Sequence, residues 1–126
     1  MSVLDDIAAA DDLATTTVDV PEWGRKVTLK AHSIDTALAF EVAVDEWKTA
    51  HGGEAMKPLR VAATYLAFAI LGDDGQPLGA PAIETLMRKS RPVIERLFLA
   101  APSMARQVES LSGESSAVPS GASSSV

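Results

Sequence analysis

The sequence has 126 residues, of which 47% are hydrophobic and 22% charged, so it is long and apolar enough for one globular domain with its own core. It contains no cysteine, which excludes disulfides, thiolate nucleophiles and cysteine-ligated metal sites. The net charge of −6 arises in the first 22 residues, which contain no lysine or arginine. The 11 basic side chains that follow are balanced by 11 acidic ones. Because nucleic-acid binding normally requires a basic face and none dominates here, we expect no nucleic-acid partner.

The apolar pattern argues against two further classes. The N-terminus has no basic residue ahead of an apolar run, so we expect no secretory signal. The longest apolar stretch, residues 61–71, is far shorter than the roughly 20 residues that a membrane-spanning helix needs. We therefore expect no contact with a membrane.

Residues 1–14 are predicted to form an acidic N-terminal arm. Leu4 and Ile7 fall on one side of a short helix over residues 1–13, whereas the aspartates of the same segment favour a chain without fixed structure. We expect partial order, between these two alternatives.

A β-hairpin is predicted directly after this arm. Thr15 to Val20 and Arg25 to Ala31 are rich in β-branched residues and alternate in polarity, and Pro21-Glu22-Trp23-Gly24 between them is typical of a turn. Because a lone two-stranded ribbon is only marginally stable, we expect the hairpin to pack on helices. The residues that share its inner face are Thr16, Val18 and Val20 on the first strand and Val27, Leu29 and Ala31 on the second.

A helix is predicted over residues 34–50, with Ser33 as its N-cap and the glycines after His51 ending it. Its apolar residues form two stripes at the helical repeat of about 3.6 residues, so the helix can contact two different surfaces. The first stripe comprises Ala37, Phe40, Ala43, Val44 and Trp47, and the second comprises Ile34, Leu38 and Val42.

Three more helices are predicted beyond this one. The helix from Pro58 to Leu71 carries no charge after Arg60 and belongs in the middle of the structure. After a turn at residues 72–77, one helix starts near Pro81, and another is capped by Ser90 and continues, through a restart at Pro102, to about Leu111. The expected inner faces are Ile83, Leu86 and Met87 for the former and Val93, Ile94, Leu97, Phe98 and Ala101 for the latter.

These elements predict a mainly α fold with a small N-terminal β-hairpin, an α+β class with about four helices packed around the apolar central helix. Residues 15–110 are expected to form this helical domain. Residues 111–126 are dominated by serine and glycine and lack large apolar side chains, so we expect them to be disordered.

No constellation of residues predicts catalysis. His51 ends a helix, where an imidazolium is favourable, so we expect it to be a structural cap, and His32 merely follows a strand. Asp73-Asp74-Gly75 resembles the start of a calcium loop with Glu84 as its twelfth residue, but glycine and proline occupy the intervening ligand positions. The carboxylates on the helix over residues 34–50 are expected to be solvated: Glu41, Asp45 and Glu46. We therefore expect no enzyme activity, no cofactor and no metal.

A charge-balanced body with spare apolar surface is typical of a protein that binds another polypeptide. The candidate partner-binding residues are Ile34, Phe40, Leu38, Val42, Val44 and Trp47 from the two stripes and Arg88, Lys89 and Arg91 from a basic cluster that also contains Arg96. The alternative for the stripes is burial between the hairpin and the apolar helix. The alternative for the basic cluster is a solvated helix junction, and its functional interpretation is contact with an acidic partner such as the arm of this chain or of another copy.

Two stretches carry a resemblance to a known family: Val18 to Lys30, with Pro-Glu-Trp-Gly at its turn, and Ile70 to Ala101, with Asp-Asp-Gly-Gln-Pro-Leu and Arg-Pro-Val-Ile-Glu-Arg-Leu-Phe. Over about residues 15–110 the chain resembles the tail assembly chaperones of long-tailed, siphovirus-type bacteriophages and prophages. The resemblance implies a protein of the host cytoplasm that binds and solubilises the tape-measure protein and associates with itself. In many such phages a longer form, made by translational frameshifting, has a C-terminal extension that recruits the tail tube protein. The resemblance therefore implies the tail tube protein as a second partner if this chain has such a form, and the sequence leaves that question open.

Two other functions stay open from the sequence. A structural head–tail connector or minor tail protein of a phage-like particle would remain in the finished particle, unlike a chaperone. A regulator or acidic mimic of DNA is motivated by the aspartates at positions 5, 6, 11 and 12, and it would depend on residues 1–13.

Overall fold

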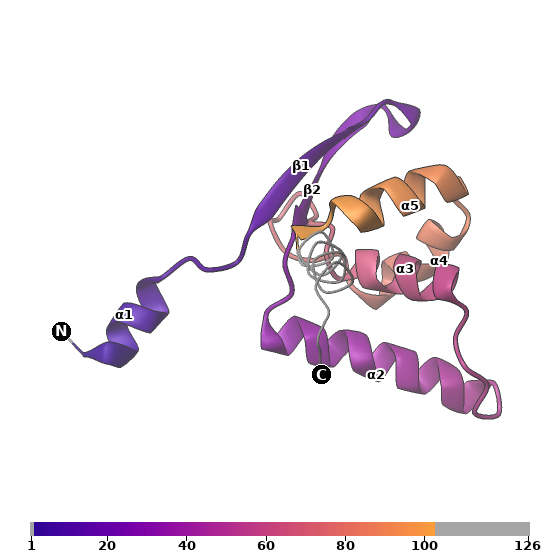
Figure 1. Ribbon diagram of the computed structural model, residues 1–126, viewed down its shortest axis with the longest axis horizontal. Coiled ribbons are helices and arrows are strands. Elements are labelled where there is room, and N and C mark those ends of the chain that lie inside the picture. Colours follow the sequence, from indigo (N-terminus) through magenta and orange to yellow (C-terminus); the bar gives the residue numbers. More distant parts are fainter. Residues whose placement is uncertain (1, 103–126) are drawn as a thin grey trace, which may run out of the picture.

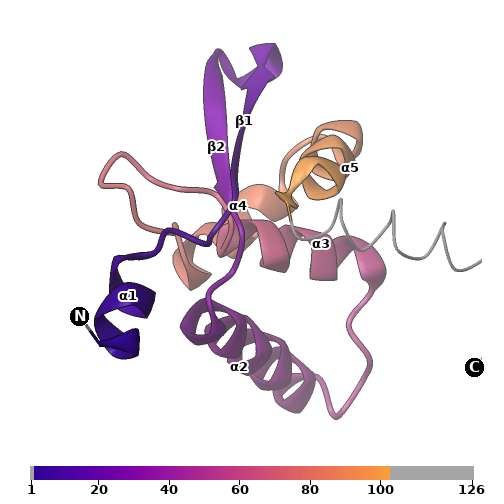
Figure 2. The ribbon, with the colours of Figure 1, turned by 60° about the vertical axis from the view of Figure 1, so that its left-hand side comes forward.

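The computed structural model describes residues 2–102, which form a mainly helical α+β fold with one small antiparallel sheet, as predicted (Figure 1). In chain order the elements are α1 (Val3–Ala9), β1 (Thr15–Val20), the 3-10 turn η1 (Pro21–Trp23), β2 (Arg25–Lys30), α2 (Ile34–Ala50), α3 (Pro58–Ala67), η2 (Ala80–Ala82), α4 (Ile83–Met87) and α5 (Arg91–Ala100). Helix α3 lies in the middle, with α2 on one side of it and the hairpin and α5 on the other (Figures 1 and 2). The predicted fold class is therefore confirmed.

The hairpin has the strands and the turn that the sequence predicts. Its register places Thr16 opposite Leu29 and Val18 opposite Val27, so the predicted apolar faces coincide. Burial alternates along both strands, because successive side chains point to opposite faces of a sheet. Gly24 closes the turn with a φ of 71°, a left-handed conformation that glycine adopts without steric cost.

Helix α2 begins and ends where the sequence predicts. The Ser33 side chain accepts a hydrogen bond from the Thr36 backbone N–H at 3.1 Å, which satisfies one of the free donors of the first turn. After the C-cap residue His51, Gly52 has a φ of 67° and Gly53 a φ of 83°, so the helix cannot continue.

Helix α3 is shorter than predicted: it ends at Ala67 and not at Leu71. The chain beyond it becomes extended and pairs with the outer edge of β2, where Lys30 donates to the Ala69 carbonyl at 2.9 Å and Leu71 donates to the Thr28 carbonyl at 3.0 Å. A continuous apolar run has no periodicity that separates a buried helix from a buried strand, and here the unpaired edge of β2 decides the outcome.

The helix predicted from Pro81 is also smaller than expected. A 3-10 turn precedes the five-residue α4, which buries Leu86, while Met87 is exposed and its predicted burial is wrong. The 3-10 turn changes the angular position of the residues that follow, and so short a helix presents little more than one side chain to the core. Helix α5 has the predicted inner face, although Ser90 occupies the N-cap without a side-chain hydrogen bond. The predicted continuation to Leu111 and the tail of residues 111–126 lie outside the described residues.

The core is built from aliphatic side chains that meet around α3. Its largest fully buried members are Leu29 and Val20 from the hairpin, Leu66 from α3, and Leu97 and Val93 from α5. Since these residues come from three separate elements, loss of one of them leaves a cavity that its neighbours cannot easily fill.

We expect the substitution Leu97→Ala to lower the free energy of unfolding by about 2–5 kcal/mol, the usual cost of a cavity in a well-packed core. Leu99→Ala is the matched control, because Leu99 lies on the exposed side of the same helix and its loss should cost less than about 1 kcal/mol. Urea denaturation of the two variants measures the difference, and equal losses would contradict the described packing of α5.

Candidate functional site

The two apolar stripes of α2 have different environments. The first stripe, from Ala37 to Trp47, is half-buried against α3 and the core. The second stripe faces away from the protein: Ile34 is 81% exposed, and Leu38 and Val42 are each 53% exposed. We call these three residues the outer stripe. Because one face of α2 already satisfies the core, the outer stripe is apolar surface with no packing role among residues 2–102.

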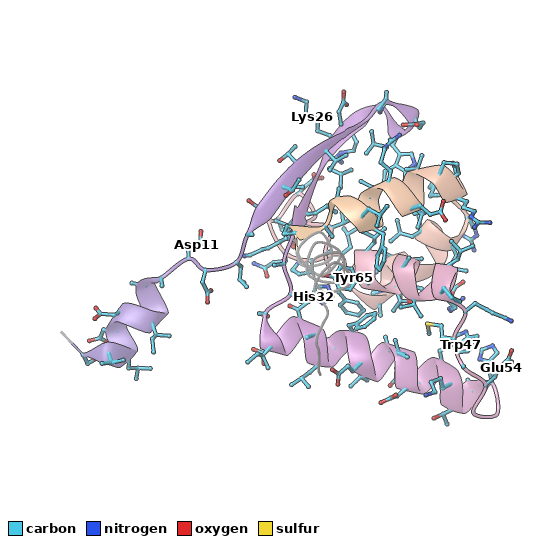
Figure 3. All side chains as sticks on the ribbon, viewed as in Figure 1. Asp11, Lys26, His32, Trp47, Glu54 and Tyr65 are labelled. Carbon is cyan, nitrogen blue, oxygen red and sulfur yellow. The ribbon has the colours of Figure 1, made fainter. Side chains whose placement is uncertain are left out.

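Aromatic contacts hold the inner face of α2 in place near its first turns. The rings of Phe40 and Tyr65 meet edge to face with their centroids 5.7 Å apart, and His32 stacks on Tyr65 at 4.1 Å. Figure 3 shows His32 and Tyr65 together between α2 and α3. Burial lowers the pKa of His32, and a hydrogen-bonding contact of its Nε2 with the Tyr65 carbonyl at 3.4 Å partly opposes this effect. The neutral ring is therefore the form that fits this position.

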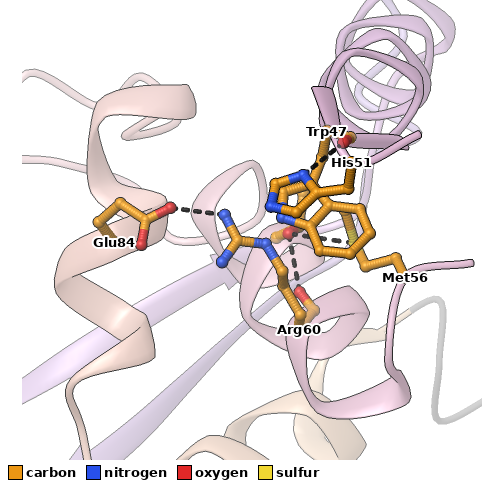
Figure 4. A network of polar contacts seen from close by, with 6 residues as sticks. Trp47, His51, Met56, Arg60 and Glu84 are labelled. Carbon is orange, nitrogen blue, oxygen red and sulfur yellow. Dashed lines mark hydrogen bonds and ion pairs between the residues drawn. The ribbon is translucent and has the colours of Figure 1, made fainter. Parts of the chain in front are cut away.

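A second set of contacts fixes the other end of α2 (Figure 4). The His51 ring stacks on Trp47 at 4.0 Å, and its Nδ1 lies 2.8 Å from the Trp47 carbonyl oxygen, which makes His51 the structural cap that the sequence predicts. The Arg60 guanidinium lies 5.5 Å from the centre of the Trp47 ring and forms an ion pair with Glu84. Trp47 is thereby joined to both α3 and α4, and the orientation of α2 is fixed at both ends.

The outer stripe has an acidic border. From Ile34 to Val42 it extends about 12 Å along the helix. The exposed charged residues of α2 that surround it are Asp35, Glu41, Asp45, Glu46 and Lys48. A shallow hollow of about 380 Å³ continues from Val42 towards the end of the helix, between Asp45, Glu46 and Thr49. The face as a whole suits an apolar segment that also carries basic side chains.

The nine predicted partner-binding residues do not form one surface. Ile34, Leu38 and Val42 are exposed together, whereas Phe40 packs against the core and Val44 and Trp47 are half-buried on the same inner face of α2. Arg88, Lys89 and Arg91 lie at the junction of α4 and α5, away from the outer stripe. These are three locations, and only the outer stripe and the basic junction are available to a partner in the described structure.

The basic cluster is partly engaged within the chain. Arg91 pairs with Glu95 one helical turn later at 3.2 Å. Arg96 makes a two-pronged contact with Glu22 in the hairpin turn, at 2.9 and 3.2 Å, and this hydrogen bonding lowers the pKa of the Glu22 carboxyl. The internal acidic partner of Arg96 is thus the hairpin turn and not the N-terminal arm.

A groove that the sequence did not predict lies between β2, the chain from Ile70 to Leu78, and α4. Its volume is about 530 Å³, and its apolar lining includes Trp23, Val27 and Leu86. The groove arises because the extended chain after α3 leads into a turn that stands away from the hairpin, a non-local arrangement that no single segment indicates. Leu78, directly after this turn, lines the groove and is exposed.

Residues 2–102 contain no group of three or more histidine, aspartate or glutamate side chains placed to hold a metal ion. Within the same described segment, no helix has the length and apolarity needed to cross a membrane.

No family model matches the sequence, and no curated protein matches it. Among solved structures, the chain is similar to the tail assembly chaperone of bacteriophage HK97, with 26% sequence identity; the likeness covers 80% of this chain and 91% of that chain, with a TM-score of 0.49. At this TM-score the likeness establishes neither the fold nor the function of this chain. What the protein binds therefore has to follow from its own surface and sequence.

We expect Phe40→Asp to lower the free energy of unfolding by about 2–4 kcal/mol, because it places a carboxylate against the aromatic contacts of Tyr65. Leu38→Asp, on the opposite face of the same helix, should cost less than about 1 kcal/mol. Chemical denaturation of both variants tests the assignment of inner and outer faces, which is disproved if Leu38→Asp is the more damaging change.

We expect stability to fall as the pH drops below about 6.5, the ordinary pKa of histidine. Burial holds the pKa of folded His32 below that value, so the unfolded chain takes up the proton first and its population grows in this range. His32→Phe keeps an aromatic ring against Tyr65 and cannot titrate, so its urea midpoint should change less between about pH 7.5 and pH 5. Parallel pH profiles for the two proteins would refute the role of His32.

Proposed function

We propose that this protein is a phage tail assembly chaperone of the host cytoplasm, and that the outer stripe of α2 binds apolar helical segments of the tape-measure protein. The observation that carries the proposal is the exposure of Ile34, Leu38 and Val42 on a helix whose other face is fixed to the core. An apolar strip on a held helix is a recurring means of binding a partner helix.

The size of the outer stripe suits reversible binding. Covering three partly exposed aliphatic side chains contributes on the order of 1–2 kcal/mol each. Association of two proteins costs at least about 4 kcal/mol in lost freedom of motion, so one copy alone would bind weakly. Several copies along one long partner would bind tightly together and still exchange one at a time. A chaperone that has to leave its client needs this combination.

The identity of the partner rests on the sequence resemblance. Val18 to Lys30 and Ile70 to Ala101 resemble tail assembly chaperones, and the tape-measure protein is the client of that family. The acidic border of the outer stripe adds a chemical requirement. A bound segment should carry lysine or arginine beside its apolar residues, because the border holds four carboxylates and one lysine.

We expect Leu38→Asp to weaken binding of the tape-measure protein at least tenfold, since it places a charge in the middle of the apolar contact. Ala39→Asp is the matched control: it adds the same side chain at an exposed site of the same helix, but outside the outer stripe. Co-expression of each variant with the tape-measure protein, followed by pull-down and a solubility assay, measures the effect. Melting curves establish that both variants are folded.

Equal binding by Leu38→Asp, Ala39→Asp and the natural chain would rule out the outer stripe as the binding surface. The alternative function, a structural component of the particle, makes a different prediction. Mass spectrometry of purified particles would find such a component in stoichiometric amounts, whereas a chaperone is absent after assembly.

A further inference from the structure

We propose that helix α1 of one copy docks into the groove between β2, the Ile70–Leu78 chain and α4 of a second copy. We call this groove the β2–α4 groove. The inference concerns contacts between copies of this chain and does not depend on the identity of the tape-measure protein as a client.

Helix α1 is an apolar surface without a partner in the described chain. Val3, Leu4 and Ile7 are each at least 65% exposed, and no residue of the helix is buried. The Ser2 side chain accepts a hydrogen bond from the Asp5 N–H at 3.1 Å, so the helix has its own N-cap. Seven residues are nevertheless too few for a stable isolated helix in water. A second surface that covers its apolar side would supply the missing stabilisation.

The β2–α4 groove has the size and lining for such a helix. Its volume of about 530 Å³ lies within the roughly 300–1,000 Å³ of pockets that enclose sizeable ligands. Trp23 from the hairpin turn, Val27 from β2, Leu86 from α4 and the exposed Leu78 provide apolar walls. Two or three aliphatic side chains from one face of α1 would therefore exchange water for an apolar environment.

The charges of the two surfaces are complementary. The groove is lined by Arg25, Lys26 and Lys89, and its one carboxylate, Asp73, is already paired with Arg25 at 3.5 Å. The arm carries four aspartates, at positions 5, 6, 11 and 12, and no basic residue. The outer stripe of α2, the other apolar surface, has an acidic border and would repel the same arm. Charge thus selects the β2–α4 groove for α1.

The geometry favours a second copy over the same chain. The Ala31 N–H donates to the Ala14 carbonyl at 2.9 Å and fixes the base of the arm beside the start of the hairpin. Lys26 lies roughly 17 Å further along β2, and the groove is on the edge of β2 away from β1. Figure 3 shows Asp11 beyond the base of the hairpin and Lys26 near its other end.

Within one chain, the four residues 10–13 span at most about 14 Å, and α1 adds about 10 Å. Placing Asp5 beside Lys26 would require this segment to cross β2 and then run almost straight along it, with hardly any slack. A second copy is under no such restriction. Each copy carries one arm and one groove, so the contact joins the arm of one copy to the groove of the next.

Cross-linking tests the proposal directly, because the chain has no natural cysteine. The Leu4→Cys variant is mixed with a Leu78→Cys variant that has a different tag, and the mixture is treated with a short bis-maleimide. The cross-linked dimer that contains one copy of each variant is identified by its mass. We expect several-fold more mixed dimer than from Leu4→Cys with Thr49→Cys, a control site exposed on α2. Adding Lys26→Glu and Lys89→Glu to the groove variant should reduce the yield at least fivefold. Asp5→Lys and Asp6→Lys in the arm variant should restore it.

Two results would overturn the proposal. The first is a mixed-dimer yield equal to that of the Thr49→Cys control. The second concerns a double variant that has both Leu4→Cys and Leu78→Cys in one chain. The proposal fails if this variant forms a cross-link within the monomer while the mixture of the two single variants gives no more mixed dimer than the control. Either result leaves binding by the outer stripe untouched, because these experiments contain no tape-measure protein.

Discussion

The requirement that α3 be buried on nearly every side organises this protein. Beyond Arg60 the helix has no charge, and Ala62 to Ala67 are all buried. Helices α4 and α5 pack against it, α2 covers another side (Figure 1), and the hairpin contributes Val20 and Leu29 to the same core. A helix that covers another from one side can use only one of its own faces, so the second apolar stripe of α2 has to remain outside. The candidate binding face is therefore a direct consequence of how the core is closed.

Fixed contacts at both ends give this face a defined orientation. Phe40 packs against Tyr65 near the start of α2, and Trp47 is held between His51 and Arg60 at its end. The aromatic side chains have few rotatable bonds and lose little entropy when they are ordered. Arg60 has a longer side chain, which is held by its ion pair with Glu84 as well as by the Trp47 ring. A binding surface that is already ordered spends less free energy on association. Even a short stripe of three aliphatic side chains can then contribute to recognition.

Local patterns predicted the parts of the structure that local interactions determine. The hairpin, the Ser33 cap and the two stripes of α2 follow from alternation, capping chemistry and helical spacing, and each is present as expected. The end of α3 was mispredicted because Ile70 pairs with Leu29 at the edge of the sheet. Leu29 lies more than forty residues earlier in the chain, so the local sequence around Ile70 does not indicate this pairing. Met87 was misplaced because a 3-10 turn changed the phase of α4. The β2–α4 groove could not be predicted for the same reason as the end of α3, because segments that are distant in the sequence form it.

Electrostatics separates the two exposed apolar surfaces from one another. Apolar contacts have little directionality, so the outer stripe and the β2–α4 groove would otherwise compete for the same segments. The carboxylates around the outer stripe favour a basic apolar helix, while Arg25, Lys26 and Lys89 at the groove favour an acidic one. Because the arm is the acidic helix and α2 repels it, contact between copies would leave the outer stripe open. Contact between copies and binding of a client are then compatible. The acidic arm is repelled from the outer stripe, and a basic client segment is repelled from the β2–α4 groove.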